Sequence, residues 1–307
     1  MITASILSEP LAGLQAQAHG LAEAAQLSPR LIALAPRAPW RFVTARLWPA
    51  PLRAVGLADP GDDILLSAGG TAGVVAYALR RPGRRLVQVQ HPRQDPARFD
   101  VVVVNRHDGL TGPNVIVTRT ALHRVTPQRL AKAAEIWRPR LAHLPRPLVA
   151  VLIGGSNGRF RLDGDVAAAL GRQLAEMMRA DRVGVALTPS RRSSAEAVAA
   201  LANSVERLGG WVWDLAGDNP YYGMLALADA IVVTEDSVSM VSEAAATAAP
   251  VLLAALPGQS RRIRMFTRLL EEDGRVRRFA GRLDLWPVEP MNDTLAAGQD
   301  VRHRLGY

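Results

Sequence analysis

Short apolar runs alternate with amphipathic stretches along most of the chain. A run of four to six mostly apolar residues predicts a strand, and apolar positions three or four apart predict a helix. In the first half these patterns predict strands at Ile2–Leu7, Leu31–Ala35, Asp63–Ser67, Leu86–Gln90, Val101–Val104 and Val115–Val117. The predicted helices are Gly13–Gln26, Gly69–Leu79 and Thr126–Trp137, the last beginning with the Thr-Pro pair typical of a helix start.

The same alternation resumes after residue 147. Strands are predicted at Leu148–Ile153, Val183–Leu187, Trp211–Trp213, Ala230–Val233 and Val251–Ala254. The intervening helices are Asp165–Met178, Ser193–Leu208, Asn219–Leu227, Ser237–Ala246 and Arg262–Glu272. The remainder contains prolines and is predicted to be irregular.

Regular strand–helix alternation indicates parallel sheets covered by helices on both faces. The proline-containing stretch Pro139–Pro147 is interpreted as a linker. The predicted fold class is therefore α/β, with two Rossmann-like domains facing a cleft. The expected limits are 1–143 and 144–285, with a C-terminal segment, 286–307, that packs back on the N-terminal domain. Ligands of such sheets bind beyond the carboxyl ends of the strands, so the loops after strands are where chemistry is expected.

Composition narrows the class of protein. Of 307 residues, 49% are hydrophobic and 21% charged, as in ordinary globular proteins. The absence of cysteine excludes disulfides and thiolate zinc sites and fits a reducing compartment. No apolar run reaches the roughly 18 residues of a membrane span, and the N-terminus lacks the basic start of a signal peptide. We expect a cytoplasmic protein that can also bind peripherally to the inner face of the membrane.

The net charge of +9 comes almost entirely from arginine, because Lys132 is the only lysine. The candidate partners of such a surface are phosphorylated small molecules, an anionic membrane surface and nucleic acid. Alternatively, codon usage in a GC-rich genome would explain the excess of arginine without any such partner. The arginines occur in scattered pairs, and aromatic residues make up only 5% of the chain. Few stacking platforms and no nucleic-acid-binding motif argue against nucleic acid as a partner.

Three loops of the second half carry polar groups directly after predicted strands. The first contains Gly154, Gly155, Ser156 and Asn157, but has neither dinucleotide-fold nor P-loop spacing. The second contains Thr188, Ser190, Arg191 and Arg192, a set suited to phosphate. The third contains Asp236, Ser237, Ser239, Met240 and Glu243 and begins an Ala-rich helix. Each loop also has a purely structural interpretation. The first would be a tight turn, the second a capped helix start and the third a capping box.

In the first half, two strand ends carry histidines. Gln88–Arg93 contains His91 and Arg93, and Asn105–Asp108 contains His107 and Asp108. A histidine beside a carboxylate can act as a general base near neutral pH, and a structural loop histidine is the alternative. No metal-ligand spacing and no nucleophile elbow is present in the sequence.

At these residues the chain resembles the elongated-mitochondria (mitochondrial fission) family of proposed glycosyltransferases, as a bacterial member. Asn219-Pro220-Tyr221-Tyr222-Gly223 followed by Thr234–Met240 is the most specific part of the resemblance. It implies a GT-B fold, with donor nucleotide on the C-terminal domain near Tyr222, Ser237 and Glu243. The acceptor would lie on the N-terminal domain, near the residues Gly13, Gln17, Gly69, Gly70, Thr71 and Arg93.

The resulting hypothesis is a metal-independent glycosyltransferase that uses a nucleotide sugar as substrate and holds no tightly bound cofactor. Its expected acceptor is a lipid-linked or cell-envelope molecule. A nucleotide-sugar epimerase and a non-enzymatic, membrane-associated scaffold of the fission-factor type are the alternatives.

Overall fold

The structure, a computed structural model, describes residues 2–307. The chain divides into two compact units: residues 2–124 together with Asn292–Tyr307, and Val125–Met291. Each unit contains a six-stranded parallel sheet. The predicted fold class, α/β with two Rossmann-like domains, is confirmed.

The first unit has the strand order β2-β1-β3-β4-β5-β6. Its strands are β1 (Ile2–Ser8), β2 (Leu27–Ala33), β3 (Ile64–Ala68), β4 (Arg85–Val89), β5 (Val101–Asn105) and β6 (Val115–Thr118). Its helices are α1 (Ala12–Ala24), α2 (Pro51–Val55), α3 (Gly70–Ala78) and α10 (Thr294–Leu305). Short 3-10 turns occur at Trp40–Phe42, Ala45–Leu47, Pro96–Arg98 and Arg106–Asp108.

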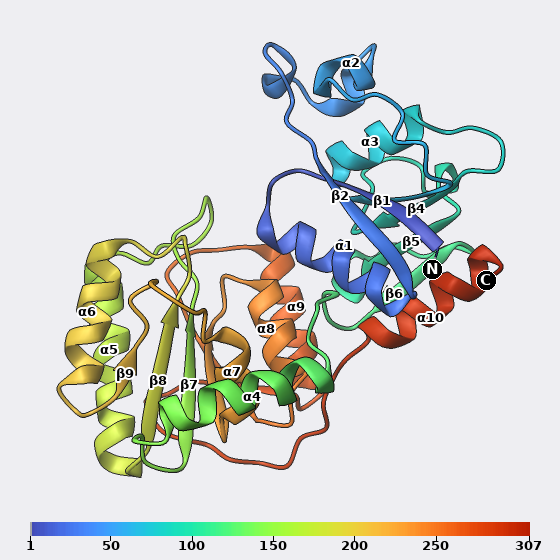
Figure 1. Ribbon diagram of the computed structural model, residues 1–307. Helices are drawn as coiled ribbons and strands as arrows, with labels where there is room; N and C mark the ends of the chain where they lie inside the picture. The colour runs from blue at the N-terminus through green and yellow to red at the C-terminus, as the bar shows by residue number, and fades with distance from the viewer. Residues whose placement is uncertain (1) are drawn as a thin grey trace. The chain divides into compact units, whose positions relative to one another are not determined.

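The two faces of this sheet are covered by different helices. Successive strand residues point to opposite faces, so Ile6 packs with α1 and α10 while Leu7 packs with α2 and α3. Figure 1 shows α10, at the C-terminal end of the chain, lying beside α1. Ala297 and Val301 of α10 belong to the buried core on that face.

The second unit has the strand order β12-β11-β10-β7-β8-β9. Its strands are β7 (Leu148–Ile153), β8 (Gly184–Pro189), β9 (Trp211–Val212), β10 (Ala230–Thr234), β11 (Val251–Ala254) and β12 (Val276–Arg278). Its helices are α4 (Pro127–Leu141), α5 (Gly164–Asp181), α6 (Ala195–Glu206), α7 (Tyr221–Leu227), α8 (Val238–Ala245) and α9 (Arg261–Glu272).

Helices α5 and α6 cover one face of this second sheet, and α4 and α7 lie on the other (Figure 1). The approach of α7 to α4 requires a glycine, because a Cβ added at Gly223 would lie 2.3 Å from the Trp137 ring. Trp137 and Leu141 of α4 are buried in the core of this unit. That packing places α4 in the second unit, whereas the sequence analysis placed its residues before the boundary at 143.

Three elements differ from the sequence prediction. Strand β2 runs from Leu27 to Ala33, not from Leu31 to Ala35, and it contains Pro29. Proline is tolerated there because β2 is an edge strand that pairs only with β1. Helix α4 continues through Pro139 to Leu141, so the predicted linker is partly helical.

The third difference is the C-terminal remainder, which was predicted to be irregular but contains β12 and α10. Helix α10 ends at Gly306 in a left-handed conformation (φ 84°).

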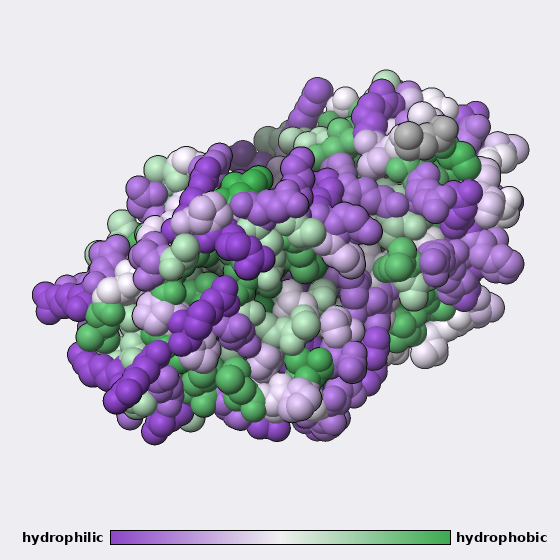
Figure 2. Space-filling view, turned by 60° about the horizontal axis from the view of Figure 1, so that its bottom comes forward, coloured by the Kyte–Doolittle hydropathy of each residue, from purple (hydrophilic) through white to green (hydrophobic). Residues whose placement is uncertain are grey.

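Within residues 2–307 no helix is both long enough and apolar enough to cross a membrane. Figure 2 shows hydrophobic residues interspersed with hydrophilic ones on the face that it presents.

Candidate functional site

The strand order of the second unit creates a crevice at a defined place. The chain starts in the middle of the sheet at β7, winds outward to β8 and β9, and then returns to β10 on the other side. Parallel sheets bind ligands at such a switch point, beyond the carboxyl ends of the two diverging strands. In this unit the switch point lies between the loop after Ile153 and the loop after Thr234.

Gly154 and Gly155, the first residues after β7, are buried in contact with the neighbouring loops. The Gly154 N–H donates to Thr234 Oγ1 (2.8 Å), and the Gly155 N–H donates to Asp236 Oδ2 (3.3 Å). A Cβ at Gly154 would lie 2.2 Å from Asp236 Oδ1, and one at Gly155 would lie 2.3 Å from the Arg192 carbonyl oxygen. Glycine is therefore required at both positions by close packing within the protein.

Asp236 connects all three strand-end loops. Its carboxylate accepts hydrogen bonds from Thr234 Oγ1 (2.7 Å) and from Arg192 Nη2 (2.8 Å), in addition to the Gly155 N–H. The Asp236 side chain is fully buried, while the Arg192 side chain is 41% exposed. A buried carboxylate with three donors is fixed in place, so Asp236 positions the loops and is not itself accessible to a ligand.

The loop after β8 is bonded to the same glycine. Ser190 Oγ and Ser193 Oγ both donate to the Gly154 carbonyl oxygen, at 2.8 and 2.5 Å. Thr188 is buried within β8, and its hydroxyl donates to the Pro189 carbonyl oxygen. Arg191 is exposed and makes no ion pair with any residue that the structure describes. Of the two predicted arginines, Arg192 is thus held by the protein, and Arg191 is available to an anion.

The third loop leads into α8. Ser237 caps this helix, its Oγ accepting from the Met240 N–H at 3.3 Å. Ser237, Ser239 and Met240 are all partly exposed, so the first turn of the helix is accessible. Free N–H groups and the helix dipole make such a turn suited to a phosphate group.

Glu243 lies in the same helix, six residues after its cap. The Tyr221 hydroxyl of α7 donates to Glu243 Oε2 (2.5 Å). Burial raises the pKa of Glu243 to about 7, and the Tyr221 hydrogen bond only partly opposes this rise. The pKa of Tyr221 is also raised, by burial and by the nearby carboxylate. Glu243 therefore changes its charge near neutral pH.

The remaining predicted residues of this unit have local roles. Tyr222 packs edge-to-face on Tyr221, with ring centroids 5.8 Å apart. Ser156 Oγ accepts from the Leu162 N–H, and Asn157 Oδ1 accepts from two N–H groups of its own loop. These bonds shape the loop after β7.

The first unit has a switch point of its own, between β1 and β3. Gly13 and Gln17 lie in α1, after β1, and Gly69, Gly70 and Thr71 begin α3, after β3. Gly69 has a φ of 86°, and no side chain caps α3. A Cβ at Gly69 would lie 3.2 Å from Leu14 of α1. The predicted acceptor residues of α1 and α3 thus meet at one sheet edge.

The loop after β4 is also part of this edge. Gln90 Nε2 donates to Gln17 Oε1 (3.1 Å). Both Gln90 (φ 68°) and Arg93 (φ 55°) adopt the left-handed conformation that non-glycine residues rarely occupy. Backbone strain of this kind is often found at functional sites. The Arg93 N–H donates to Nδ1 of His91 (2.9 Å), so a neutral His91 ring carries its proton on Nε2.

His107 and Asp108 lie in a 3-10 turn after β5, and their side chains are only 1% and 6% exposed. Asp108 accepts from the Asn105 N–H (3.4 Å) and so caps its own turn. His107 Nε2 lies 3.8 Å from Asp108 Oδ1. The two predicted residues are neighbours, as the sequence indicates, but both are buried in this conformation.

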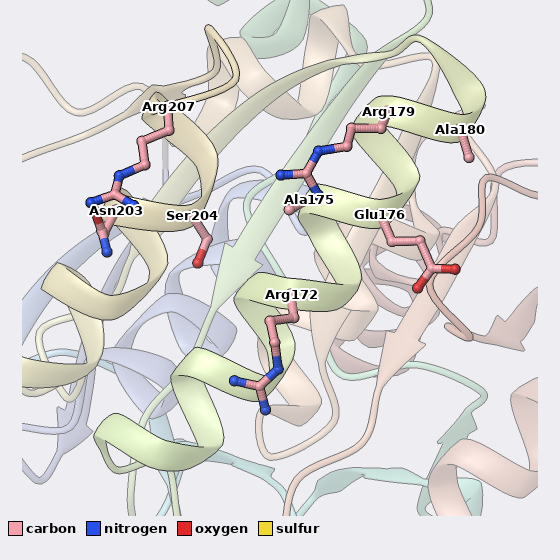
Figure 3. Close-up of a pocket in the computed structure, with 8 residues that line it drawn as sticks. All are labelled: Arg172, Ala175, Glu176, Arg179, Ala180, Asn203, Ser204 and Arg207. Carbon is pink, nitrogen blue, oxygen red and sulfur yellow. The ribbon is translucent and has the colours of Figure 1, made fainter.

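A cavity of about 680 Å³ lies elsewhere, on the outer side of α5 and α6. Figure 3 shows Arg172 and Arg179 of α5 and Arg207 beyond α6 around it. It contains none of the strand-end residues, so it is separate from the candidate site.

The structure adds three participants that stand in the predicted stretches but were not predicted individually as site residues. Thr234 and Ser193 bond to Gly154, and Tyr221 bonds to Glu243. Thr234 and Ser193 stand in the two strand-end stretches of the sequence analysis, so their position was a usable signal. Nothing in the sequence indicated that Tyr221 would reach Glu243 across two helices.

Comparisons with known proteins agree with this architecture. A putative uridine-diphosphate-N-acetylglucosamine 2-epimerase of Listeria monocytogenes is similar in fold, with a TM-score of 0.60 and 12% identity over 98% of this chain and 95% of that one. MurG of Acinetobacter baumannii has a TM-score of 0.54 and 15% identity over 100% of this chain and 95% of that one. At this level of identity the likeness establishes the fold, which is that of the GT-B class.

The sequence then identifies the family. Residues 12–305 match the family described as Mitochondrial fission ELM1, and the chain belongs to that family. The mitochondrial fission protein ELM1 of Arabidopsis thaliana is 33% identical over 275 residues. That match covers 80% of this chain but only 64% of the plant protein.

Proposed function

We propose that this protein is a glycosyltransferase that transfers a sugar from a nucleotide-activated donor, with the donor bound at the β7/β10 switch point. The observation that carries the proposal is the convergence of three strand-end loops on Asp236. Such cross-linking holds an anion-suited helix start and an arginine-containing loop in a fixed relation.

Each part of the site has a role in this proposal. The N–H groups of the first turn of α8 and the exposed Arg191 stabilise the negative charge that develops on the leaving diphosphate. Glu243, when ionised, accepts hydrogen bonds from hydroxyls of the ribose or of the donor sugar. Gly154 and Gly155 let the loops after β7, β8 and β10 pack closely against one another, which keeps the helix start and the arginine-containing loop in place.

The acceptor is proposed to be lipid-linked or a cell-envelope molecule, bound at the β1/β3 edge of the first unit. His91 is the proposed general base. Because its Nδ1 already accepts from the Arg93 N–H, taking a proton there requires that hydrogen bond to break. His91→Ala is expected to lower turnover roughly 100-fold or more. The same change at the exposed His143 serves as the control and should leave turnover unchanged.

Binding of the donor is tested by thermal shift with the sugar conjugates of UDP, GDP, ADP and CMP. One of them is expected to raise the melting temperature of the wild type and not that of Ser237→Ala/Glu243→Ala. Ser260→Ala is the matched control, because Ser260 caps α9 in the same way and its side chain accepts from the Ile263 N–H of its own helix. It should lose cap stability of about 1 kcal/mol but retain the ligand-induced shift. No shift with any nucleotide would refute donor binding.

Chemistry on the donor alone is the competing enzymatic function. Incubating the bound donor without acceptor distinguishes the two, since an epimerase converts the donor sugar and a transferase does not. Accumulation of an epimer would replace the transferase proposal.

A further inference from the structure

The segment between β2 and β3 contains an unusual stretch, residues 36–58, which we name the 36–58 segment. It includes the two 3-10 turns Trp40–Phe42 and Ala45–Leu47 and the short helix α2. It contains arginines and no acidic residue; the arginines are Arg37, Arg41, Arg46 and Arg53. In Figure 1 it forms the blue stretch around α2, on the side of the sheet that carries α3.

The 36–58 segment is anchored on the domain. Trp48 is only 7% exposed, and its Nε1–H donates to the Val43 carbonyl oxygen at 3.0 Å. Ala45, Trp48 and Ala54 belong to the buried core beneath α3. The segment therefore presents its remaining side chains from a fixed base.

Two large apolar side chains of this segment face solvent. Phe42 is 75% exposed and Leu47 is 73% exposed, more than any other large hydrophobic residue in the part of the chain that the structure describes. They occupy the ends of the two successive 3-10 turns. Neither packs against a core cluster, so neither contributes burial to the folded domain.

The arginines around them make no ion pairs with the described residues. The Arg41 guanidinium lies 4.5 Å from the Phe42 ring centroid. Several arginines elsewhere in this unit are paired, as Arg84 is with Asp59 and Arg119 with Asp293. Exposed apolar side chains that are surrounded by basic residues, with no acidic residue among them, are typical of a segment that binds at a membrane interface.

We infer that the 36–58 segment docks the first unit on an anionic lipid surface, with Phe42 and Leu47 inserted and the arginines against the headgroups. This deepens the lipid-linked acceptor proposed above by naming the surface that would bring the site to such a molecule. A second copy of the chain fits less well, because a two-fold interface would place the same unpaired arginines against one another.

The test is flotation of the full chain with phosphatidylcholine vesicles, with and without phosphatidylserine. Wild type is expected to bind only the anionic vesicles and to be released by high salt. Phe42→Ser/Leu47→Ser should weaken binding roughly tenfold or more through lost insertion. Arg41→Gln/Arg46→Gln should weaken it roughly 25-fold, at about fivefold for each arginine.

The matched control is Arg172→Gln/Arg207→Gln, which removes two arginines from the basic cavity on α5 and α6. It should bind vesicles as wild type does. Equal loss in the control, or full binding by Phe42→Ser/Leu47→Ser, would overturn the inference. Phe42 and Leu47 are exposed and the arginines make no ion pairs, so Phe42→Ser/Leu47→Ser and Arg41→Gln/Arg46→Gln should both have the melting temperature of the wild type.

The absence of cysteine permits a second, direct measurement. A single cysteine introduced by Leu47→Cys can carry an environment-sensitive fluorophore, with Leu285→Cys as control because Leu285 is 53% exposed in the other unit. Only the label at 47 should shift to the blue on anionic vesicles. A self-association that quenches this label without vesicles would instead indicate a second copy. Nucleotide-induced thermal shifts should persist in all these variants, so failure of lipid binding and failure of donor binding are distinguishable.

Discussion

The two switch points of this molecule are built differently. At the β7/β10 edge a buried carboxylate, Asp236, joins three loops, and a serine side chain caps the helix that begins there. At the β1/β3 edge the helix begins at an uncapped glycine, and the neighbouring loop holds two non-glycine residues in left-handed conformations. The first edge is rigid and charged, whereas the second is shaped mainly by its backbone.

This contrast indicates different ligands. A fixed cluster of hydrogen-bond donors suits a chemical group that every nucleotide sugar shares, such as the diphosphate. An edge shaped mainly by its backbone suits a ligand recognised by its shape. The following variants test whether the rigid edge alone is responsible for nucleotide binding.

The largest effect is expected at Gly154. A methyl group there would lie 2.2 Å from Asp236 Oδ1, so Gly154→Ala must displace the central carboxylate. We expect a loss of about 3 kcal/mol in unfolding free energy and no nucleotide-induced shift. Gly158→Ala is the control in the same loop, since its Cβ would meet no atom within 4 Å. Denaturant unfolding of both proteins measures the difference, and equal stabilities would show that the loops are not tightly joined.

Asp236→Asn is expected to come next. It keeps the shape of the side chain but removes the charge that holds Arg192, which should cost about 2–3 kcal/mol. Asp218 forms an exposed pair with Arg140, so Asp218→Asn should change stability by less than about 0.5 kcal/mol. A small effect at both positions would contradict the positioning role of Asp236.

Glu243 gives the rigid edge a pH dependence. Its pKa is raised from 4.5 to about 7, so the folded protein holds this proton more tightly than the unfolded chain does. The associated stabilisation is fully present below pH 4.5 and is lost as the pH rises through about 7. Glu243→Gln should remove this loss, as melting temperatures across the range would show.

The same ionisation should act on the proposed donor in the opposite direction. Because the carboxylate is the form that accepts hydroxyl hydrogen bonds, wild-type affinity should rise about tenfold between pH 6 and 8. Titration calorimetry of Glu243→Gln should show no such rise. An unchanged pH dependence in this variant would exclude Glu243 from the donor contacts.

The smallest effect is expected at the other edge. Gly69→Ala places a side chain at φ 86° and ψ 171°, a conformation that essentially only glycine adopts, which should cost about 1–2 kcal/mol, and it leaves the second unit unaltered. Gly83→Ala also places a side chain at a positive φ, 79°, but meets no neighbouring atoms, so it is the control for a positive-φ substitution in the same unit. The nucleotide-induced thermal shift should survive both changes. Its loss in Gly69→Ala would break the comparison drawn between the edges.

Much of this architecture could be predicted from the sequence because buried parallel strands are almost entirely apolar. The strands β7 and β11 begin and end where their apolar runs do. The predicted range of β2 differs from the observed one because an edge strand needs no continuous apolar run and tolerates a proline such as Pro29. Helix α10 was missed because Gly298 and several charged residues weaken its pattern, and its stability comes from packing on α1.

The candidate site could be predicted less completely. Gly154, Arg192 and Asp236 could be predicted because they follow strands directly, and the ends of parallel strands converge at one edge of the sheet whatever the side chains are. Whether a polar group faces a ligand or another loop depends on three-dimensional contacts. For that reason Asp236, expected to contact the donor, is instead fully buried and bonded to the surrounding loops.

The return of the C-terminal helix has a consequence for dissecting the molecule. The chain passes from one unit to the other at 124–125 and back at 291–292, so cutting it once cannot separate two intact domains. A fragment ending at residue 124 would lose Ala297, Val301 and Leu305 from its core. The first domain should be recovered as an independent fold only when residues 292–307 are supplied, either fused after residue 124 or added as a separate peptide.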